Sequence, residues 1–385
     1  MRILLVADGR SPITQQWLQY FIQQGHQVHL ASTFACQPQL GLASLHHTPV
    51  AYSSVAPQGR SARGLRAILP TGLRTALRNL AGPLTLPGAT AGLQAVIRQV
   101  QPQLVHALRI PYEGMLAAAA LAESQLPLLV SVWGNDFTLH ARSTPLMAAA
   151  TRRALRRASG LLADTQRDLQ LAQQWSLPAG APTLAVPGNG GVRRNLFHPP
   201  KQPVTAPRII NPRGLRAYVR NDVFFRALAQ VVKQVPDLQV DCPAMQGEPQ
   251  AEAWVRQHGL HAHVNLLPKL APADLAESYR RAQLMVSPST HDGTPNTLLE
   301  AMACGLLPVA GDLDSIREWI TPGENGLLVN PNDAKALAAA ILRGLNDEAL
   351  RSKTASHNAT LIAERADYHS GMRRAEAFYQ AVLSR

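Results

Sequence analysis

The densest group of side chains able to do chemistry lies between residues 287 and 305, where two carboxylic acids stand eight positions apart. The first, Asp292, is followed directly by Gly293, which lets the backbone come close to a ligand. A carboxylate at Asp292 accepts hydrogen bonds from sugar hydroxyl groups, and the two oxygens of Glu300 suit the diol of a ribose. These residue types predict a site for a ligand that carries hydroxyl groups.

A helix start lies between the two acids. Thr294 is typical of an N-cap and Pro295 of a first helical position, so we expect the helix to begin there. The backbone amides of Asn296, Thr297 and Leu298 then point outward with the positive end of the helix dipole. Such an end attracts a diphosphate, although plain capping is the simpler interpretation of Gly-Thr-Pro taken alone.

The elements that position this segment follow a regular alternation of short apolar runs and helical patterns. In the first half, the expected buried strands are residues 3–7, 28–31, 104–107, 128–132, 160–163 and 184–186. In the second half they are residues 208–210, 238–241, 264–267, 284–287 and 307–310, with a helix over 295–304. This alternation predicts two doubly wound domains, each with a parallel sheet between helices.

A Pro-rich stretch at residues 198–207 separates the two halves and is the best linker in the sequence. We therefore expect an N-terminal, acceptor-side domain of residues 1–200 and a C-terminal, donor-binding domain of residues 201–360. Residues 361–385 are expected to form a helix that crosses back to the first domain. Residues 53–92, rich in Gly, Pro and Arg, predict a mobile excursion with one helix near residues 73–80.

The segment 287–305, with residues 306–312 and 325–329 after it, resembles the donor site of retaining glycosyltransferase family 4. The resemblance covers about residues 205–345. It implies an α/β chain of the GT-B fold, in which two Rossmann-like doubly wound domains face a central cleft. It also implies a hexosyltransferase-type enzyme that takes a sugar from a nucleotide diphosphate donor, a UDP- or GDP-sugar, with retention and without a metal or another cofactor.

By this resemblance Glu300 holds the ribose of the nucleotide, and Asp292, in place of the more usual Glu, contacts the transferred sugar. The family also places an Arg and a Lys after the first strand of the C-terminal domain, where they neutralise the leaving diphosphate. Here the matching stretch carries three arginines and no lysine. We expect Arg213 to be one member of the pair and either Arg216 or Arg220 to be the other.

The N-terminal half resembles the family more loosely, through polar residues at strand ends. Trp133 stands where many family members have a His that contacts the donor sugar. Asn135 and Asp136 are expected to supply polar contacts there, and Asp136 is a further candidate for a catalytic role. His106 is another candidate for the cleft, although a His at the end of a buried strand more often belongs to the core.

Positive charge is concentrated in the first half of the chain. Residues 1–200 hold 17 Lys and Arg against 6 Asp and Glu, whereas residues 201–385 hold 20 against 19. Such an asymmetry predicts an anionic partner, which is a membrane leaflet, an acidic glycan or a phosphorylated acceptor. The sequence has no recognised nucleic-acid-binding motif, so nucleic acid is not expected. Four arginines on one expected helix suit anionic lipid headgroups or are simply solvated: Arg152, Arg153, Arg156 and Arg157.

The cysteines and the lengths of the apolar runs bear on where in the cell the protein is located. Three cysteines without a C-x-x-C spacing predict reduced thiols rather than disulfides or a metal site. No window approaches the roughly 18 consecutive apolar residues of a membrane-spanning helix, and the apolar start of the chain is too short for a signal peptide. We therefore expect a cytoplasmic protein that is peripheral on the cytosolic face of a membrane.

Three functions fit these features. The first is a retaining glycosyltransferase that acts on a hydroxyl of a lipid-linked, cell-surface or small-molecule acceptor. The second is a nucleotide-sugar epimerase of the same fold, which needs no acceptor. The third is a catalytically silent nucleotide-sugar binder, suggested by Trp133 in the histidine position.

Overall fold

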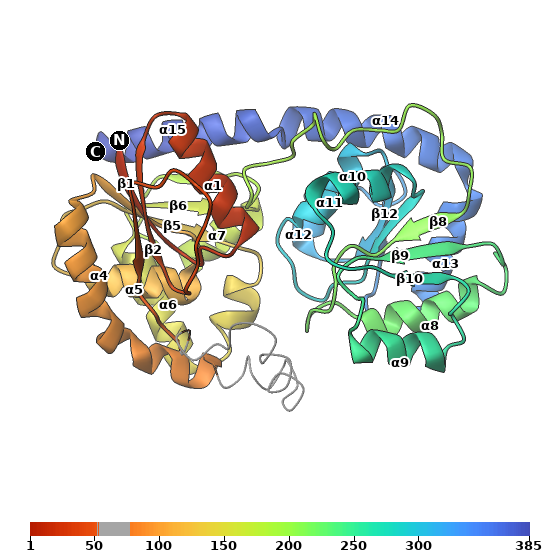
Figure 1. The fold of residues 1–385 in the computed structure, drawn as a ribbon, viewed down its shortest axis with the longest axis horizontal. Coiled ribbons are helices and arrows are strands. Elements are labelled where there is room, and N and C mark those ends of the chain that lie inside the picture. Colours follow the sequence, from red (N-terminus) through yellow and green to blue (C-terminus); the bar gives the residue numbers. More distant parts are fainter. Residues whose placement is uncertain (52, 54–77) are drawn as a thin grey trace. The chain divides into compact units, whose positions relative to one another are not determined.

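The computed structural model describes residues 1–51, 53 and 78–385. The chain divides into two compact units: unit 1 holds Met1–Gly190 together with Ser370–Arg385, and unit 2 holds Gly191–His369. Within the described residues, each unit contains an all-parallel sheet with helices packed on it (Figure 1). The predicted alternation of strands and helices is thereby confirmed, and the fold is α/β.

The strands of unit 1 are β1 Arg2–Ala7, β2 Gln27–Ser32, β3 Ser44–His47, β4 Leu104–Ala107, β5 Leu128–Val132, β6 Gly160–Ala163 and β7 Thr183–Ala185. Among the described residues they form a sheet in the order β3-β2-β1-β4-β5-β6-β7. The order reverses between β1 and β4, whose register pairs Leu5 with His106. Ligands of open parallel sheets bind beyond the carboxyl ends of the strands at such a reversal.

The helices of unit 1 are α1 Pro12–Gln23, α4 Leu86–Val100, α5 Met115–Ala120, α6 Pro145–Arg157, α7 Gln166–Gln174 and most of α15 Tyr368–Leu383. Successive side chains of a strand point to opposite faces of a sheet. Leu4 and Val6 therefore pack into the core beneath α4, α5 and α6. Figure 1 shows α1 and α15 on the other face. Because both faces are covered, β1 is apolar and buried from Ile3 to Ala7.

The expected excursion over residues 53–92 is only partly right. A short helical turn at Gly82–Thr85 leads into α4, so residues 82–92 are helical rather than loop. Leu93, Val96 and Val100 recur at helical spacing and are buried in the core of unit 1, which explains why the Gly and Pro residues before them do not break the pattern. The expected helix near residues 73–80 lies mostly outside the described residues.

The helical stretch Arg78–Val100 is also long and apolar enough in composition to cross a membrane, with a mean hydropathy of 1.2 over its most apolar window. The expectation concerned about 18 consecutive apolar residues, and this stretch contains no such run. Leu, Ile, Val and Ala raise its average hydropathy, although Thr and Gln stand between them. Only 17% of its most apolar window is buried inside the structure.

The last residues of the chain complete unit 1. Tyr379 of α15 is fully buried and stacks on Phe21, with 4.6 Å between ring centroids. Glu376 accepts hydrogen bonds from the Tyr20 hydroxyl at 3.0 Å and lies 2.7 Å from His26 Nε2. Residues 370–385 thus pack on α1, although they follow unit 2 in the sequence.

The strands of unit 2 are β8 Arg208–Ile210, β9 Gln239–Cys242, β10 Val264–Leu266, β11 Leu284–Ser287, β12 Leu307–Gly311 and β13 Leu327–Val329. Its helices are α8 Asn221–Val231, α9 Pro249–Gln257, α10 Pro272–Arg280, α11 Asn296–Ala303, α12 Asp314–Arg317, α13 Ala334–Asn346 and α14 Glu348–Arg365. In the described part of the chain the sheet order is β10-β9-β8-β11-β12-β13, and it reverses between β8 and β11. One apolar cluster packs α8, α9 and α13 on the sheet, and a second packs α10, α11 and α14.

The boundary between the units lies after residue 190 rather than at the Pro-rich stretch near residue 200. Val192 forms a parallel bridge with Asp367, and its amide donates to the Ala366 carbonyl at 2.7 Å. Phe197 is buried in a core cluster of unit 2. The Pro-rich stretch therefore runs along unit 2, because the residues that precede it are already anchored there.

Candidate active site

The helix start predicted between the two acids is present but begins one residue later than expected. Pro295 is the N-cap of α11, with φ −67° and ψ 121°, and Asn296 is the first helical residue. Thr294 is therefore not the N-cap residue, and its hydroxyl accepts a hydrogen bond from Trp319 Nε1 at 2.9 Å. Thr294 therefore ties the loop before α11 to the body of unit 2.

Donors remain available at this helix end. The Leu298 amide is not among them, because it donates to the Pro295 carbonyl at 2.9 Å. The amides of Asn296 and Thr297 donate to no acceptor among the described residues. Asn296 Oδ1 is buried and likewise has no hydrogen-bond partner there. With the positive end of the helix dipole, these groups suit an anionic ligand that also carries a donor.

Arg213 and Asp292 form the charged centre of the site. Arg213 donates to Asp292 Oδ2 at 2.5 Å and to the Thr297 hydroxyl at 3.2 Å. The Arg213 side chain is 7% exposed and that of Asp292 is 12% exposed, so both charges lie at the edge of solvent. The guanidinium group therefore stands beside the first turn of α11.

Backbone contacts hold the loop that carries Arg213 against the loop that carries Asp292. Thr290 donates to the Tyr218 carbonyl through its amide at 2.8 Å, and the Arg220 amide donates to the Pro288 carbonyl at 3.0 Å. Val219 and Ser289 form an antiparallel bridge between these contacts. The two loops follow β8 and β11, the strands at which the sheet order reverses. Residues about 80 positions apart are thereby brought together by the topology.

The structure distinguishes the other two arginines of the stretch. Arg216 is exposed, and its Nε donates to the Arg213 carbonyl at 3.0 Å. Arg220 makes a two-point ion pair with Asp222, at 2.9 and 2.8 Å, and also contacts Asn332. Asp222 raises the pKa of Arg220 through these hydrogen bonds. Arg216 thus lies next to Arg213, whereas Arg220 is held at the start of α8.

Glu300 lies half-buried on α11, about one turn after the first helical residue Asn296. Burial removes water from its carboxyl group and raises the pKa to about 8. No hydrogen bond or ion pair to this carboxyl group occurs among the residues that the structure describes. Its hydrogen-bonding capacity is therefore free for a ligand.

Two glycines shape the donor loop. Gly293 is buried between the two acids. Gly311, at the end of β12, allows the loop to lie against the sheet, because a Cβ placed there would stand 2.2 Å from the Ser289 carbonyl oxygen. The clashing atom belongs to the backbone, so no flexible side chain can move aside to relieve the contact.

We therefore expect Gly311→Ala to displace the donor loop. The free energy of unfolding should fall by about 1–3 kcal/mol through overpacking, and affinity for UDP should fall with it. Thermal unfolding and calorimetric titration with UDP measure the two effects. Gly92→Ala is the matched control, because a Cβ there meets nothing within 4 Å. A Gly311→Ala protein as stable as the Gly92→Ala protein would contradict this role.

In unit 1, Asp136 is buried and fully engaged. It accepts hydrogen bonds from Arg109 at 2.6 Å and from the amides of Trp133 and Ile110 at 3.2 and 3.4 Å. Asn135 Oδ1 lies 3.5 Å from the same arginine. Since the Asp136 side chain is 0% exposed, it positions Arg109 and the turn at Trp133 and does not itself face a ligand.

His106 belongs to the core of unit 1, which corrects its candidacy for a cleft role. A hydrogen bond joins its Nδ1 to the Tyr379 hydroxyl, and another of 2.8 Å joins its Nε2 to the Ser131 hydroxyl. Burial lowers its pKa to about 3, so the ring is neutral. Its role is to seat α15.

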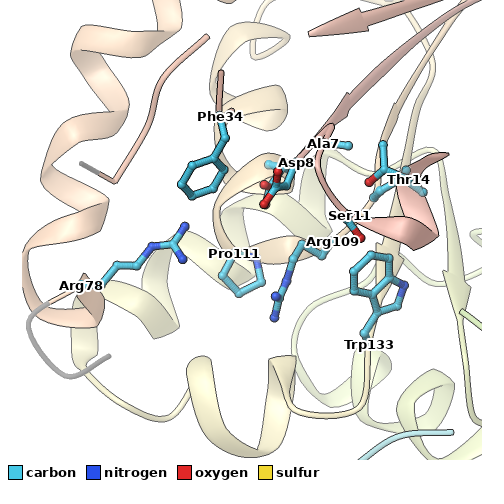
Figure 2. A pocket seen from close by; sticks show the side chains of 11 residues that line it. Ala7, Asp8, Ser11, Thr14, Phe34, Arg78, Arg109, Pro111 and Trp133 are labelled. Carbon is cyan, nitrogen blue, oxygen red and sulfur yellow. The ribbon is translucent and has the colours of Figure 1, made fainter. Parts of the chain in front are cut away.

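A pocket of about 160 Å³ lies in unit 1 beyond the carboxyl ends of β1 and β4 (Figure 2). Its lining includes Asp8, Ser11, Arg78, Arg109, Pro111 and Trp133. In Figure 2 the guanidinium groups of Arg78 and Arg109 approach the space beside Pro111 from different elements. Of these residues only Trp133 was predicted from the sequence. The available signal was that Asp8 directly follows the buried strand β1 and that Arg109 comes two residues after the end of β4.

Two family descriptions match the chain. The family "Glycosyl transferases group 1" matches residues 208–347, which contain the candidate donor site. The family "Glycosyl transferase 4-like" matches residues 77–165, which contain Arg78, Arg109 and Trp133. Together the two ranges cover more than half of the chain.

Individual proteins agree with these families. An exopolysaccharide phosphotransferase from Streptomyces coelicolor is 36% identical over 197 residues, 48% of this chain and 19% of that protein. A phosphatidyl-myo-inositol mannosyltransferase from Mycolicibacterium smegmatis is 33% identical over 134 residues, 34% of this chain and 33% of that protein. The matched part thus spans about a fifth and a third of these relatives' lengths.

A solved structure shows the same fold over nearly the whole chain. The Anabaena protein HepE, in complex with UDP and glucose, superimposes with a TM-score of 0.73 and 17% identity, over 99% of this chain and 100% of that one. At this identity the match shows a shared fold, and the two family matches show the glycosyltransferase class. The chain belongs to the group 1 glycosyltransferases of the GT-B fold.

Proposed function

We propose that the protein is a retaining glycosyltransferase that moves a sugar from a nucleotide diphosphate donor to a hydroxyl group of an acceptor. The observation that carries this proposal is the cluster of Arg213, Asp292 and the free amides of α11 at the carboxyl edge of the unit 2 sheet. A cation beside open amides stabilises a diphosphate as it leaves, which is where negative charge develops. Glu300 binds the ribose of the same nucleotide.

The chemistry requires little more from unit 2. As the glycosidic bond breaks, negative charge grows on the diphosphate, and Arg213 with the amides of Asn296 and Thr297 neutralises it. The Asp292 carboxylate orients hydroxyl groups of the transferred sugar. With retention, the acceptor hydroxyl attacks from the face that the diphosphate leaves, and a donor phosphate oxygen accepts its proton. No metal ion and no other cofactor has a part in this scheme.

The donor is proposed to be a UDP-sugar. HepE, which has the same fold, is described in complex with UDP and glucose, and this supports UDP ahead of GDP. The identity of the sugar depends on Asp292, whose side chain is one methylene shorter than that of the Glu that is usual in the family. The shorter side chain places the carboxylate further from the sugar, so it suits a sugar whose hydroxyl groups are arranged differently.

We propose a lipid-linked or cell-surface glycan acceptor and a position at the cytosolic face of a membrane. A relative is described as a phosphatidyl-myo-inositol mannosyltransferase, which supports a lipid acceptor. Unit 1 also exposes Leu80, Leu84 and Leu146 by 58%, 66% and 44%. Exposed arginines continue along α6 from Leu146, and this pairing of apolar and basic side chains suits an anionic leaflet: Arg152, Arg153 and Arg156.

Donor binding tests the proposal directly. We expect UDP and one UDP-sugar to raise the melting temperature of the full chain, because a ligand that binds only the folded state stabilises it. GDP and ADP at the same concentrations are the matched controls. Product analysis with and without an acceptor then separates transfer from epimerisation, which needs none. Failure of every UDP- and GDP-sugar to shift the melting temperature would remove the proposed donor site.

A further inference from the structure

The ion pairs of the unit 1 pocket leave one of its arginines without a carboxylate partner among the described residues. Arg109 is paired with Asp136 at 2.6 Å, and Asp8 is paired with Arg10 at 2.9 Å. In each pair one positive charge faces one negative charge. The carboxylates of the pocket are therefore already matched to cations other than Arg78, except for Glu113.

Glu113 is held by neutral donors. The Thr33 hydroxyl donates to its Oε1 at 2.8 Å, and the Tyr112 amide donates to its Oε2 at 2.8 Å. Glu113 is 3% exposed, and burial raises its pKa. Both carboxyl oxygens of Glu113 thus accept hydrogen bonds from neutral donors, and Glu113 forms no ion pair with Arg78 among the described residues.

Arg78 is the cation of the pocket without an ion pair. Among the described residues, no carboxylate oxygen lies within 4.0 Å of its guanidinium group. Its Nε is buried and has no hydrogen-bond partner in that part of the chain. The guanidinium carbon lies 4.7 Å from the ring centre of Tyr112, whose hydroxyl donates to the Arg78 carbonyl at 2.7 Å. Arg78 is thus held in place with a buried Nε that has no hydrogen-bond partner and with no carboxylate in ion-pair contact among the described residues.

Neutral donors line the other side of the pocket. Ser11 precedes α1 and makes no capping hydrogen bond with its side chain, and Thr14 lies in the first turn of α1. The amino end of α1 therefore adds the positive end of a helix dipole to the charge of Arg78. The pocket, of about 160 Å³, has ample room for a small anionic group.

We propose that this pocket binds an anionic substituent, a phosphate or a carboxylate, on the sugar or polyol that accepts the transferred sugar. Arg78 is the principal counterion, and the hydroxyl groups of Ser11 and Thr14 donate to the same anion. The proposal rests on the proposed transferase function and specifies its acceptor as an acidic one. Arg109, held by Asp136, lines the pocket beside Arg78 and adds a second donor.

The test titrates the full-length protein with inorganic phosphate, D-glucuronate and neutral glucose by calorimetry. UDP is kept saturating, so that the diphosphate site of unit 2 is already filled. We expect one or both anions to bind and glucose not to bind. A phosphate preference assigns a phosphorylated acceptor, and a glucuronate preference assigns an acidic glycan.

Variants locate the binding. Arg78→Ala should weaken anion binding by about tenfold or more, and Arg78→Lys should retain part of it, since charge is kept but the planar fork is lost. Arg98→Ala removes an equal charge from an exposed position of α4 and should change nothing. Equal anion binding by wild type and Arg78→Ala, or no binding of either anion to wild type, overturns the inference. UDP binding measured on the same proteins keeps the two proposals apart, because its loss in wild type contradicts the donor site alone.

Discussion

Replacing Arg213 with Ala should reduce kcat for sugar transfer by about 10²- to 10³-fold, the usual loss when one preorganised donor to a developing negative charge is removed. The side chain is 7% exposed and lies 2.5 Å from Asp292, so water cannot take its place without moving that carboxylate. The effect should appear in kcat more than in KM, because charge on the diphosphate increases as the bond breaks. Steady-state kinetics with the donor identified by thermal screening measure it.

Structural damage has to be separated from lost catalysis. Arg213→Ala leaves Asp292 without its counterion, which in a buried pair costs about 3–5 kcal/mol of stability. Activity that returns when guanidinium is added to Arg213→Ala would show that the missing group, and not the fold, limits the rate. Arg256→Ala is the matched control, because it removes an equal charge from an exposed position of α9 outside this cluster. Transfer by Arg213→Ala within threefold of wild type would contradict the assignment.

Glu300→Ala should weaken UDP binding by about 2–4 kcal/mol, roughly 30- to 1,000-fold, since two charge-assisted hydrogen bonds to the ribose are lost. The loss should be largest above pH 8. Burial raises the pKa of Glu300 to about 8, so in the free protein the group is mostly protonated at neutral pH. An ionised carboxylate accepts both hydroxyl groups of the diol, whereas the acid accepts less well. Affinity for UDP should therefore rise with pH up to about 8 and then level off.

Glu300→Gln provides the control for this pH dependence. The variant should bind UDP more weakly than wild type, with little change between pH 6 and 9. Wild type should release protons when UDP binds near pH 7, which calorimetry in buffers of different ionisation enthalpy detects. Proton release by the Gln variant equal to that of wild type would assign the titration to another group.

The raised pKa of Glu300 also predicts that the stability of the empty protein depends on pH. The pKa of Glu300 is higher in the folded chain than the ordinary value of 4.5, so its contribution to stability is fully present below that value and is lost as pH rises through about 8. In the absence of ligand, Glu300→Gln should melt above wild type at pH 8.5 and close to it at pH 4.5. A donor site that is less stable when empty is the expected cost of an unpartnered acid.

Much of the fold follows from the local pattern of the sequence. The strands β4, β5, β6 and β11 occur where apolar runs predict them, because strands buried on both faces are mostly apolar. The donor segment was recognisable for a related reason, since its acids, its glycine and its helix start are contiguous in sequence. The pair of Arg213 and Asp292 needed the additional rule that strand ends meet where sheet order reverses.

Other features depend on long-range packing that no local pattern reveals. The unit boundary was misplaced because a Pro-rich stretch runs along unit 2 after Val192 has already joined Asp367. His106 was a candidate only until its partner, 273 positions away, was known to be Tyr379. Arg78 gave no signal among the many arginines of the first half, because its distinction is the lack of a matched carboxylate in three dimensions.

The placement of Ser370–Arg385 in unit 1 has a consequence for synthesis. A nascent chain emerges from its amino end, at about 5–20 residues per second, and domains usually fold as they emerge. Here the position in the core where Tyr379 packs against Phe21 and His106 stays unfilled until the ribosome has translated all of unit 2. The second half of the protein can therefore reach its native state first, while the first half waits for its closing helix in a partly assembled form that chaperones would recognise.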